Sequence, residues 1–245
     1  MTTTRIGLIS DVHGNEIALE AVLEKLRDVR VDRIVCLGDV AALGPRPVAV
    51  LQQLEDIGCE CLLGNHDEFM IQPELVLGYA KVPLIAAAVE WCHAQLTTRE
   101  LDFIRTFKRT LELPLDSVNR LALFHGTPES NTTDLLATTP RDVVDEMIRE
   151  HEAQVMAGGH THIQMLRQHR GMLIVNPGSV GMPFKEYVGG GPPEILCQAE
   201  FAVVESNNGS ITVELYRLPL DRRSLRSAAL SVDFPMSTPL AQHYA

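Results

Sequence analysis

Residues 5–30 read RIGLISDVHGNEIALEAVLEKLRDVR, and this stretch decides the fold. Its first six residues form a short apolar run that predicts a buried strand. From Glu16 to Arg30 the apolar side chains recur at the spacing of a helix. Asp11 and His13 lie in the loop between the strand and the helix. A strand, a polar loop and a helix form the repeating unit of sheets with parallel strands.

The alternation of strand and helix continues beyond this unit. The stretch from residue 84 to about 108 is helical in pattern, in one or two pieces, with Thr97 or Thr98 capping the second. The predicted elements are strands at residues 33–37, 59–63, 120–124 and 154–157, and helices at 48–57, 84–108 and 142–150. Together with the opening unit they predict a layered α/β architecture.

The second half of the chain is richer in strands. Four stretches alternate apolar and polar side chains, as antiparallel strands do, at residues 164–168, 171–175, 199–205 and 211–217. No linker separates the two halves, so we expect one domain over residues 1–220, with two packed sheets flanked by helices. Residues 221–245 are weakly patterned, and we expect either a terminal helix or a loosely docked arm on or near this domain.

Composition and charge restrict the class of protein. A formal net charge of -11 argues against a general nucleic-acid surface, which needs clustered lysine and arginine. No apolar run is long enough to cross a membrane, and residues 1–5 lack the features of a signal peptide, so a cytoplasmic location is expected. The five cysteines show no CxxC pair, which argues against a disulfide framework. The sequence is compatible with a homo-oligomer.

Candidate metal ligands occur in five short clusters, each directly after a predicted strand. The clusters are Asp11-Val12-His13, Gly38-Asp39, Gly64-Asn65-His66-Asp67, His125-Gly126 and Gly159-His160-Thr161-His162. Sites in α/β sheets form beyond the carboxyl ends of the strands, so these clusters are expected to converge there. Carboxylate oxygens and imidazole nitrogens suit Mn, Fe, Zn, Co or Ni. A carboxylate such as Asp39 can bridge two cations roughly 3.5 Å apart.

Each cluster also has a simpler interpretation. Asp39 alone could cap a helix and Asn65 could hold a turn. Residues 160 and 162 could share one face of a strand for reasons of solvation alone. It is the convergence of all five clusters, in this order and at strand ends, that favours a metal centre.

The order DxH, GDxxxxG, GNHD, His-Gly and GHxH resembles that of the calcineurin-like metallophosphoesterases, in particular their small prokaryotic members. The Asn176-Pro177-Gly178-Ser179 stretch adds to this resemblance, which covers about residues 5–218. The family's fold is a four-layer αββα sandwich of two mixed sheets flanked by helices. The resemblance implies two divalent metal ions, with manganese the first expectation. Its implied ligands are Asp11, His13, Asp39 and His162 for one ion, and Asp39, Asn65, His125 and His160 for the other.

The resemblance also implies a mechanism. A hydroxide that bridges the metals would attack the phosphorus of a small phosphate ester. His66 would protonate the leaving oxygen, and Asp67 would orient His66 through a hydrogen bond. Leu43 and Asp67 stand where the protein phosphatases of the superfamily have arginine and glutamate, which argues against a phosphoprotein phosphatase. The small prokaryotic members that the chain resembles more often act on phosphodiesters, so a phosphodiesterase is preferred. Arg46 could reach a phosphate or belong to a rigid, solvated turn.

Other functions stay open at this point. A phosphomonoesterase or a dinucleoside polyphosphate hydrolase would use the same metal core, because specificity lies in the loops. A member that has lost catalysis could serve as a protein-binding scaffold, although this chain keeps every expected ligand. Residues 84–108 could form a cap over the site. The loop at residues 189–193 could be a lid or a plain surface loop.

Overall fold

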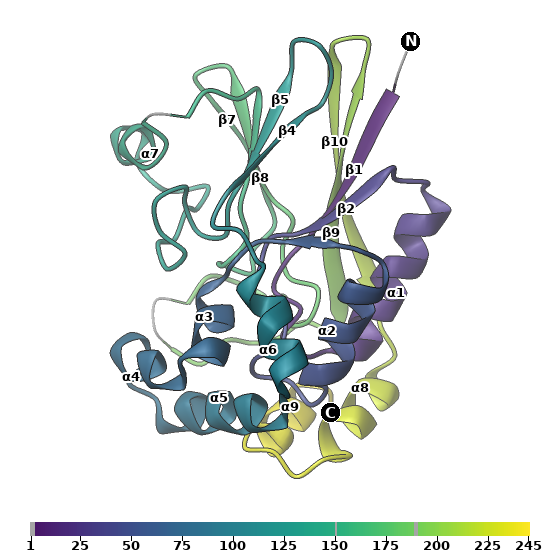
Figure 1. The fold of residues 1–245 in the computed structure, drawn as a ribbon, viewed down its shortest axis with the longest axis vertical. Coiled ribbons are helices and arrows are strands. Elements are labelled where there is room, and N and C mark those ends of the chain that lie inside the picture. The colour runs from purple at the N-terminus through teal and green to yellow at the C-terminus, as the bar shows by residue number, and fades with distance from the viewer. Residues whose placement is uncertain (1–2, 150, 189–190) are drawn as a thin grey trace.

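The computed structural model describes residues 3–149, 151–188 and 191–245, and its strands form two five-stranded sheets (Figure 1). The first sheet has the order β10 (Ser210–Pro219), β9 (Gln198–Asn207), β1 (Thr3–Ile9), β2 (Arg33–Cys36) and β3 (Glu60–Cys61). Strands β1, β2 and β3 run parallel, while β9 is antiparallel to both β1 and β10. The first sheet is therefore mixed.

The second sheet is also mixed. Its order is β4 (Leu111–Pro114), β5 (Arg120–Leu123), β6 (Val155–Ala157), β8 (Met172–Asn176) and β7 (Met165–His169). Strands β5, β6 and β8 run parallel, and the edge strands β4 and β7 are antiparallel to their neighbours. The carboxyl ends of the parallel strands in each sheet are where the predicted ligand clusters begin.

The apolar core explains why the sheets stack. Ile6 and Leu8 of β1 are buried against Leu121 and Leu123 of β5 in a cluster between the sheets. Ile9, on the opposite face of β1, joins the helices instead. Because successive side chains of a strand point to opposite faces, β1 contributes to two apolar layers. This arrangement confirms the predicted sandwich of two mixed sheets.

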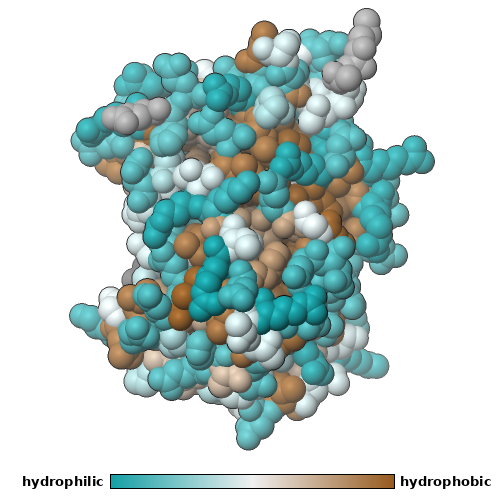
Figure 2. All heavy atoms as spheres, in the orientation of Figure 1, coloured by the Kyte–Doolittle hydropathy of each residue, from teal (hydrophilic) through white to brown (hydrophobic). Residues whose placement is uncertain are grey.

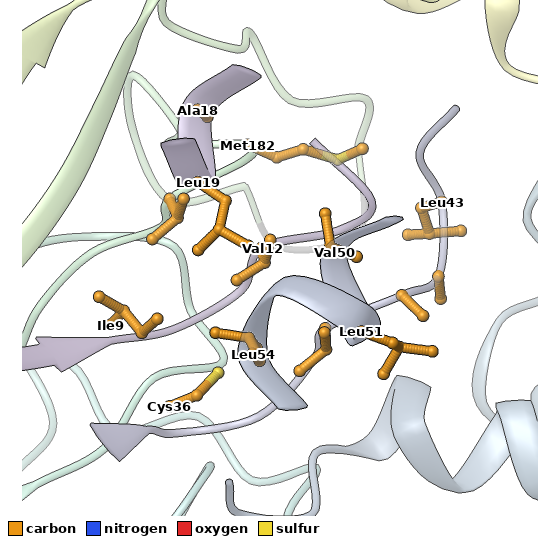
Figure 3. Close-up of a cluster of buried hydrophobic side chains, with 14 of the residues drawn as sticks. Ile9, Val12, Ala18, Leu19, Cys36, Leu43, Val50, Leu51, Leu54 and Met182 are labelled. Atoms are coloured by element: carbon orange, nitrogen blue, oxygen red, sulfur yellow. The ribbon is translucent and has the colours of Figure 1, made fainter. Parts of the chain in front are cut away.

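Helices cover the outer face of each sheet. In Figure 1, α7 (Arg141–Met147) lies at the left, α1 (Glu16–Asp28) and α2 (Pro47–Asp56) at the right, and the two sheets between them. Figure 3 shows Ile9 and Cys36 of the first sheet close to Leu19 of α1 and Leu54 of α2. On the other side, Val144 of α7 packs in a smaller cluster with the second sheet.

The remaining helices extend the structure below the first sheet. They are α3 (Asn65–Ile71), the 3-10 helix η1 (Pro73–Leu75), α4 (Val76–Tyr79), α5 (Pro83–Gln95), α6 (Thr98–Arg105), α8 (Arg222–Leu230) and α9 (Ser237–His243). The residues predicted as a tail form α8 and α9, which bury Leu225, Leu240 and Tyr244. None of the described helices has the length and apolarity needed to span a membrane.

Several element predictions need correction. The helix from Glu16 ends at Asp28, and the strand at 59–63 shortens to two residues. The helix predicted at 142–150 runs from residue 141 to 147, and Glu150 lies outside the described residues. Residues 84–108 form two helices, and Thr97 caps the second with a capping box.

Three short elements were not predicted: α3, the η1–α4 pair and β4. Helix α3 has seven residues and α4 four, so each gives a sequence window little of a helical period. Strand β4 ends at Pro114, and proline within a strand pattern argues against a strand except at a sheet edge. The structure places β4 at such an edge.

Candidate metal centre

The predicted ligands come together at the carboxyl ends of the parallel strands. Six of the seven form two groups of three, within which the ligand atoms lie no more than 4.8 Å apart. The first group is Asp11, His13 and His162, and the second is Asp39, His125 and His160. Each group therefore draws ligands from loops that follow strands of both sheets.

The first group is compact and buried. His162 Nε2 lies 3.2 Å from Asp11 Oδ1 and 3.1 Å from His13 Nε2. None of these three residues is more than 6% exposed. The backbone N–H of His160 donates to Asp11 Oδ2 at 3.0 Å, which ties the loop after β6 to the loop after β1. This contact fixes the ligands of one sheet relative to those of the other.

Asp39 belongs to the second group and also approaches the first. Its Oδ2 is 3.4 Å from His125 Nε2 and 3.8 Å from His13 Nε2. The seventh predicted ligand, Asn65, is fully buried, and neither atom of its amide has a hydrogen-bond partner in the described part of the chain. A buried amide without partners is costly unless something binds it, so Asn65 suits a ligand role beside Asp39.

Three of the imidazoles are held in the tautomer that a metal needs. The Nδ1 atoms of His13, His125 and His162 face the carbonyl oxygens of Ala42, Leu37 and Met182 at 3.0, 2.7 and 2.7 Å. A carbonyl oxygen only accepts, so each Nδ1 donates its proton. In the neutral ring the Nε2 lone pair then points into the site. Such a hydrogen bond from the second ring nitrogen is typical of metal-binding histidines.

These observations test whether divalent cations fit. The facing Nε2 atoms of His13 and His162 need positive charge between them, and so do the buried carboxylates of Asp11 and Asp39. In the described part of the chain, Asp11 Oδ1 and His125 Nε2 are buried without hydrogen-bond partners. The donor set of two carboxylates, four imidazoles and one amide suits Mn, Fe, Zn, Co or Ni. The residues fit two cations.

The backbone carries strain at this site. Asp11, His13, Asp39, His160 and His162 have φ values of 54°, 46°, 57°, 68° and 57°. This left-handed region costs an L-residue other than glycine roughly 1–2 kcal/mol. Such strain gathers where function requires a particular side-chain direction. Five of the seven predicted ligands share this strain. Their backbone conformations therefore direct the ligand side chains at a cost in local stability.

Gly64 allows a close approach between two loops of the site. A Cβ at this position would lie 2.1 Å from Asp39 Oδ1 and 2.6 Å from the backbone nitrogen of Asp39. Both distances are far below van der Waals contact. Only glycine lets the loop after β3 pack against the loop after β2, and this contact sets the position of Asp39.

Neighbouring charges shift the pKa values of His125 and His13 in opposite directions. Burial opposes the charged form of His125, but the adjacent Asp39 carboxylate outweighs it and raises the pKa of His125 to about 10. Burial and the charge of His162 lower the pKa of His13 to about 3. At neutral pH the metal-free site therefore holds a protonated His125 beside Asp39, whereas His13 is neutral.

Metal binding should release protons at neutral pH. A metal ligand must be deprotonated. His125, with its pKa of about 10, therefore loses a proton when it binds a cation. Below this pKa the apparent affinity should rise about tenfold per pH unit for each proton released. Calorimetric titration of Mn²⁺ at pH 7 in two buffers of different ionisation enthalpy measures the number released. His151→Ala, outside the site, should behave as wild type, and a heat independent of buffer would contradict the assignment.

The two predicted catalytic residues have different surroundings. His66 is 7% exposed and its ring centroid lies 5.3 Å from that of His13, edge to face. Asp67 was predicted to orient His66, and this contact is not formed. Its Oδ2 instead accepts the N–H groups of Asp39 and Gly64 at 2.7 and 3.0 Å, and its Oδ1 that of Val40 at 2.9 Å. Three backbone donors occupy the carboxylate, so Asp67 positions the Asp39 loop.

A cavity of about 380 Å³ opens beside the metal ligands. Its polar lining includes His13, Asp39, His66 and Asp134, while aromatic and aliphatic side chains form the rest. The described residues that line it include no lysine or arginine. A larger hollow of about 600 Å³, bordered by Leu26, Arg27, Ile34 and Cys59 among others, contains none of the predicted site residues. The ligand geometry therefore identifies the smaller cavity as the candidate site.

Several residues near the ligands were not assigned a role from sequence. Asp134 Oδ1 lies 3.4 Å from His160 Nε2, and Asp134 Oδ2 accepts the hydroxyl of Tyr187 at 2.6 Å. The Tyr79 ring packs edge to face on His66, with centroids 6.1 Å apart. Asp134 and Tyr79 follow no strand and belong to no motif, so the sequence carried no signal for them.

Two residues of the Asn176–Ser179 stretch also support the ligand loops. Asn176 donates to the carbonyl of Gly159 at 2.7 Å, and Ser179 donates to the carbonyl of Asp11 at 2.7 Å. The sequence singled out this stretch only as part of the resemblance. Arg46, in contrast, is exposed and bonds to Ser231 at 3.2 Å, away from the cavity.

Comparison with known proteins gives the family of this chain. Residues 4–191 match the family described as the calcineurin-like phosphoesterase superfamily domain. The chain therefore belongs to this superfamily of phosphoric ester hydrolases.

Individual proteins resemble this chain in sequence or in fold. An uncharacterised protein of Methanocaldococcus jannaschii is 26% identical over 198 residues, which cover 75% of this chain and 79% of the relative. The crystal structure of a metallophosphoesterase from Sphaerobacter thermophilus has a TM-score of 0.74 and 23% identity, and covers 98% of this chain and 100% of its own. That of a hypothetical protein from Pyrococcus horikoshii OT3 has a TM-score of 0.80 and 15% identity, with 98% and 96% coverage. At these identities the two structures support the fold alone.

Proposed function

We propose that the protein is a dinuclear metal-dependent phosphodiesterase that acts on a small phosphate ester. The observation that carries the proposal is the pair of buried ligand groups, with Asp39 between them, at the edge of a cavity. Two divalent cations held there would lower the pKa of a bound water and offset the charge that develops on phosphoryl oxygens. Manganese is our first expectation for both positions.

The protein's own residues would orient the metal ligands and protonate the leaving group. The carbonyl oxygens behind His13, His125 and His162 keep each Nε2 directed into the site. The ring of His66 lines the cavity, so it would give its proton to the leaving oxygen as general acid. Asp67 would act indirectly, because it fixes the backbone at Asp39.

The cavity favours a diester over a monoester. A monoester dianion or a polyphosphate carries more charge than a diester and usually pairs with arginine or lysine. The described lining of this cavity has neither residue. Its aromatic and aliphatic members, such as Tyr79, Phe184 and Ile195, suit instead the second ester group of a monoanionic substrate.

The test compares two chromogenic substrates that share a leaving group. Protein stripped with a chelator and reloaded with Mn²⁺ is assayed on bis-p-nitrophenyl phosphate and on p-nitrophenyl phosphate. We expect roughly tenfold or greater preference in kcat/KM for the diester, with activity lost in the chelated sample. Faster cleavage of the monoester would replace the proposal with a phosphomonoesterase. Metal uptake without turnover on either ester would favour a binding scaffold.

We also propose a cellular location and a kind of binding partner. All five cysteines are free thiols, which supports a reducing compartment such as the cytoplasm. The net charge of -11 and the uncharged aromatic wall of the cavity count against stable binding of nucleic acid. The partner we propose for the site is therefore a small molecule.

A further inference from the structure

Residues 74–84, which we call the 74–84 surface, expose an unusual amount of apolar side chain. Within this stretch Leu75, Leu77, Tyr79, Val82 and Leu84 are 43%, 68%, 45%, 51% and 37% exposed. Of the other large apolar side chains that are exposed in the described structure, Tyr187 lines the same cavity as Tyr79, and the rest belong to other elements. In Figure 2 hydrophobic atoms gather at the lower left, where Figure 1 shows α4. Several large apolar side chains exposed close together in this way indicate an interaction site.

Opposite charges lie at the two ends of this surface. Glu74 precedes the apolar residues, and Lys81 lies near their end. Both are exposed, and neither takes part in an ion pair among the described residues, although many of the protein's other surface charges do. An occupant that complements the surface therefore presents apolar side chains between a positive and a negative group, in the opposite order.

The surface itself meets this description when it is turned by a two-fold rotation. In an isologous interface the same patch serves both subunits, so Glu74 of one copy lies beside Lys81 of the other, and the reverse. Gly78 lies at the middle of the stretch, and a Cβ built there meets no atom within 4 Å. Glycine at the crossing point allows two short helices to approach closely.

We propose that two copies of this chain associate through their 74–84 surfaces, with the two α4 helices antiparallel. The apolar side chains supply the burial and the two Glu74–Lys81 pairs fix the orientation. Tyr79 belongs both to this surface and to the lining of the metal-site cavity. The interface therefore lies at the edge of the cavity, next to one of its walls. This proposal does not rest on the proposed activity.

Sedimentation equilibrium tests the interface. We expect wild-type protein to be a dimer at micromolar concentration. Leu77→Glu places a charge at the most exposed apolar position of the 74–84 surface, and the dissociation constant of the dimer should rise roughly thirtyfold or more. Val118→Glu is the matched control, because Val118 is 69% exposed and lies outside the 74–84 surface. A monomeric wild type, or a Leu77→Glu dimer of unchanged affinity, would overturn the proposal.

Charge reversal tests the orientation. Glu74→Lys and Lys81→Glu each place like charges together, so either variant alone should dimerise about tenfold more weakly. An equimolar mixture of the two variants should form heterodimers, because every facing pair is then of opposite sign. Equal behaviour of the mixture and of the separate variants would refute the antiparallel arrangement. A third outcome is also decisive. If the wild type forms no dimer in solution but binds phosphatidylcholine vesicles, and Leu77→Glu abolishes this binding, the surface binds lipid instead.

Discussion

Asp39→Asn should lose both metal ions together, and turnover should fall by roughly a thousandfold, because the cations supply several kcal/mol of charge stabilisation. The reason lies in the position of Asp39 Oδ2, which is 3.4 Å from a histidine of one ligand group and 3.8 Å from a histidine of the other. The amide that replaces the carboxylate is neutral and offers one oxygen, so neither group keeps its full charge. Any other single ligand serves one group only.

Metal content measured after gel filtration checks this prediction. Wild-type protein loaded with Mn²⁺ should retain close to two ions per chain and Asp39→Asn close to none. Asp11→Asn is the informative comparison, since Asp11 belongs to the first group alone and its loss should spare the second ion. A variant of Asp39 that keeps two ions would show that this carboxylate does not join the groups.

His66→Ala should separate metal binding from catalysis. His66 is in neither ligand group, so the variant should bind metal as wild type does. A general acid contributes about 10²–10⁴-fold, and its contribution is largest when the leaving group is a poor one. Turnover of an alkyl phosphodiester should therefore fall by roughly a thousandfold, whereas p-nitrophenyl esters, whose leaving group needs no proton, should be affected much less.

The ratio of activity on the alkyl phosphodiester to activity on the p-nitrophenyl ester decides whether His66 is the general acid. His93→Ala is a matched control, because His93 is another partly buried histidine, bonded to the carbonyl of Met70 at 2.7 Å and outside the cavity lining. Equal losses on good and poor leaving groups would assign His66 to substrate binding. Loss of metal from His66→Ala would mean that the ring supports the ligand loops.

The sequence predicted the layered fold and the gathering of the candidate ligands for a simple reason. Each cluster follows a short apolar strand, and parallel strands place their carboxyl ends at one edge. The signal for Asp11 and Asp39 was therefore local: an apolar run, then a polar residue, with a glycine directly before Asp39 and three residues after Asp11. The backbone conformations of His160 and His162 were not predicted. They lie beyond the end of β6 in left-handed conformations, not on one face of a strand, and they serve different ligand groups.

What the sequence could not supply depends on contacts between distant segments. Asp67 is bonded to backbone groups of Asp39 and Val40, and no pattern along the chain records that approach. Asp134 reaches His160 from a loop without regular structure. In both cases the partner of the carboxylate is set by how loops pack over the sheet edge, so only the three-dimensional arrangement identifies it.

The distribution of ligands along the chain has a consequence for assembly of the site. Asp11 and His13 lie at the start of the chain, whereas His162 comes 149 residues after His13. The second group likewise takes Asp39 from a loop of one sheet and His125 and His160 from loops of the other. During synthesis the amino-terminal half alone offers only part of each group. We therefore expect metal binding at these groups to follow the docking of the two sheets and to stabilise their association.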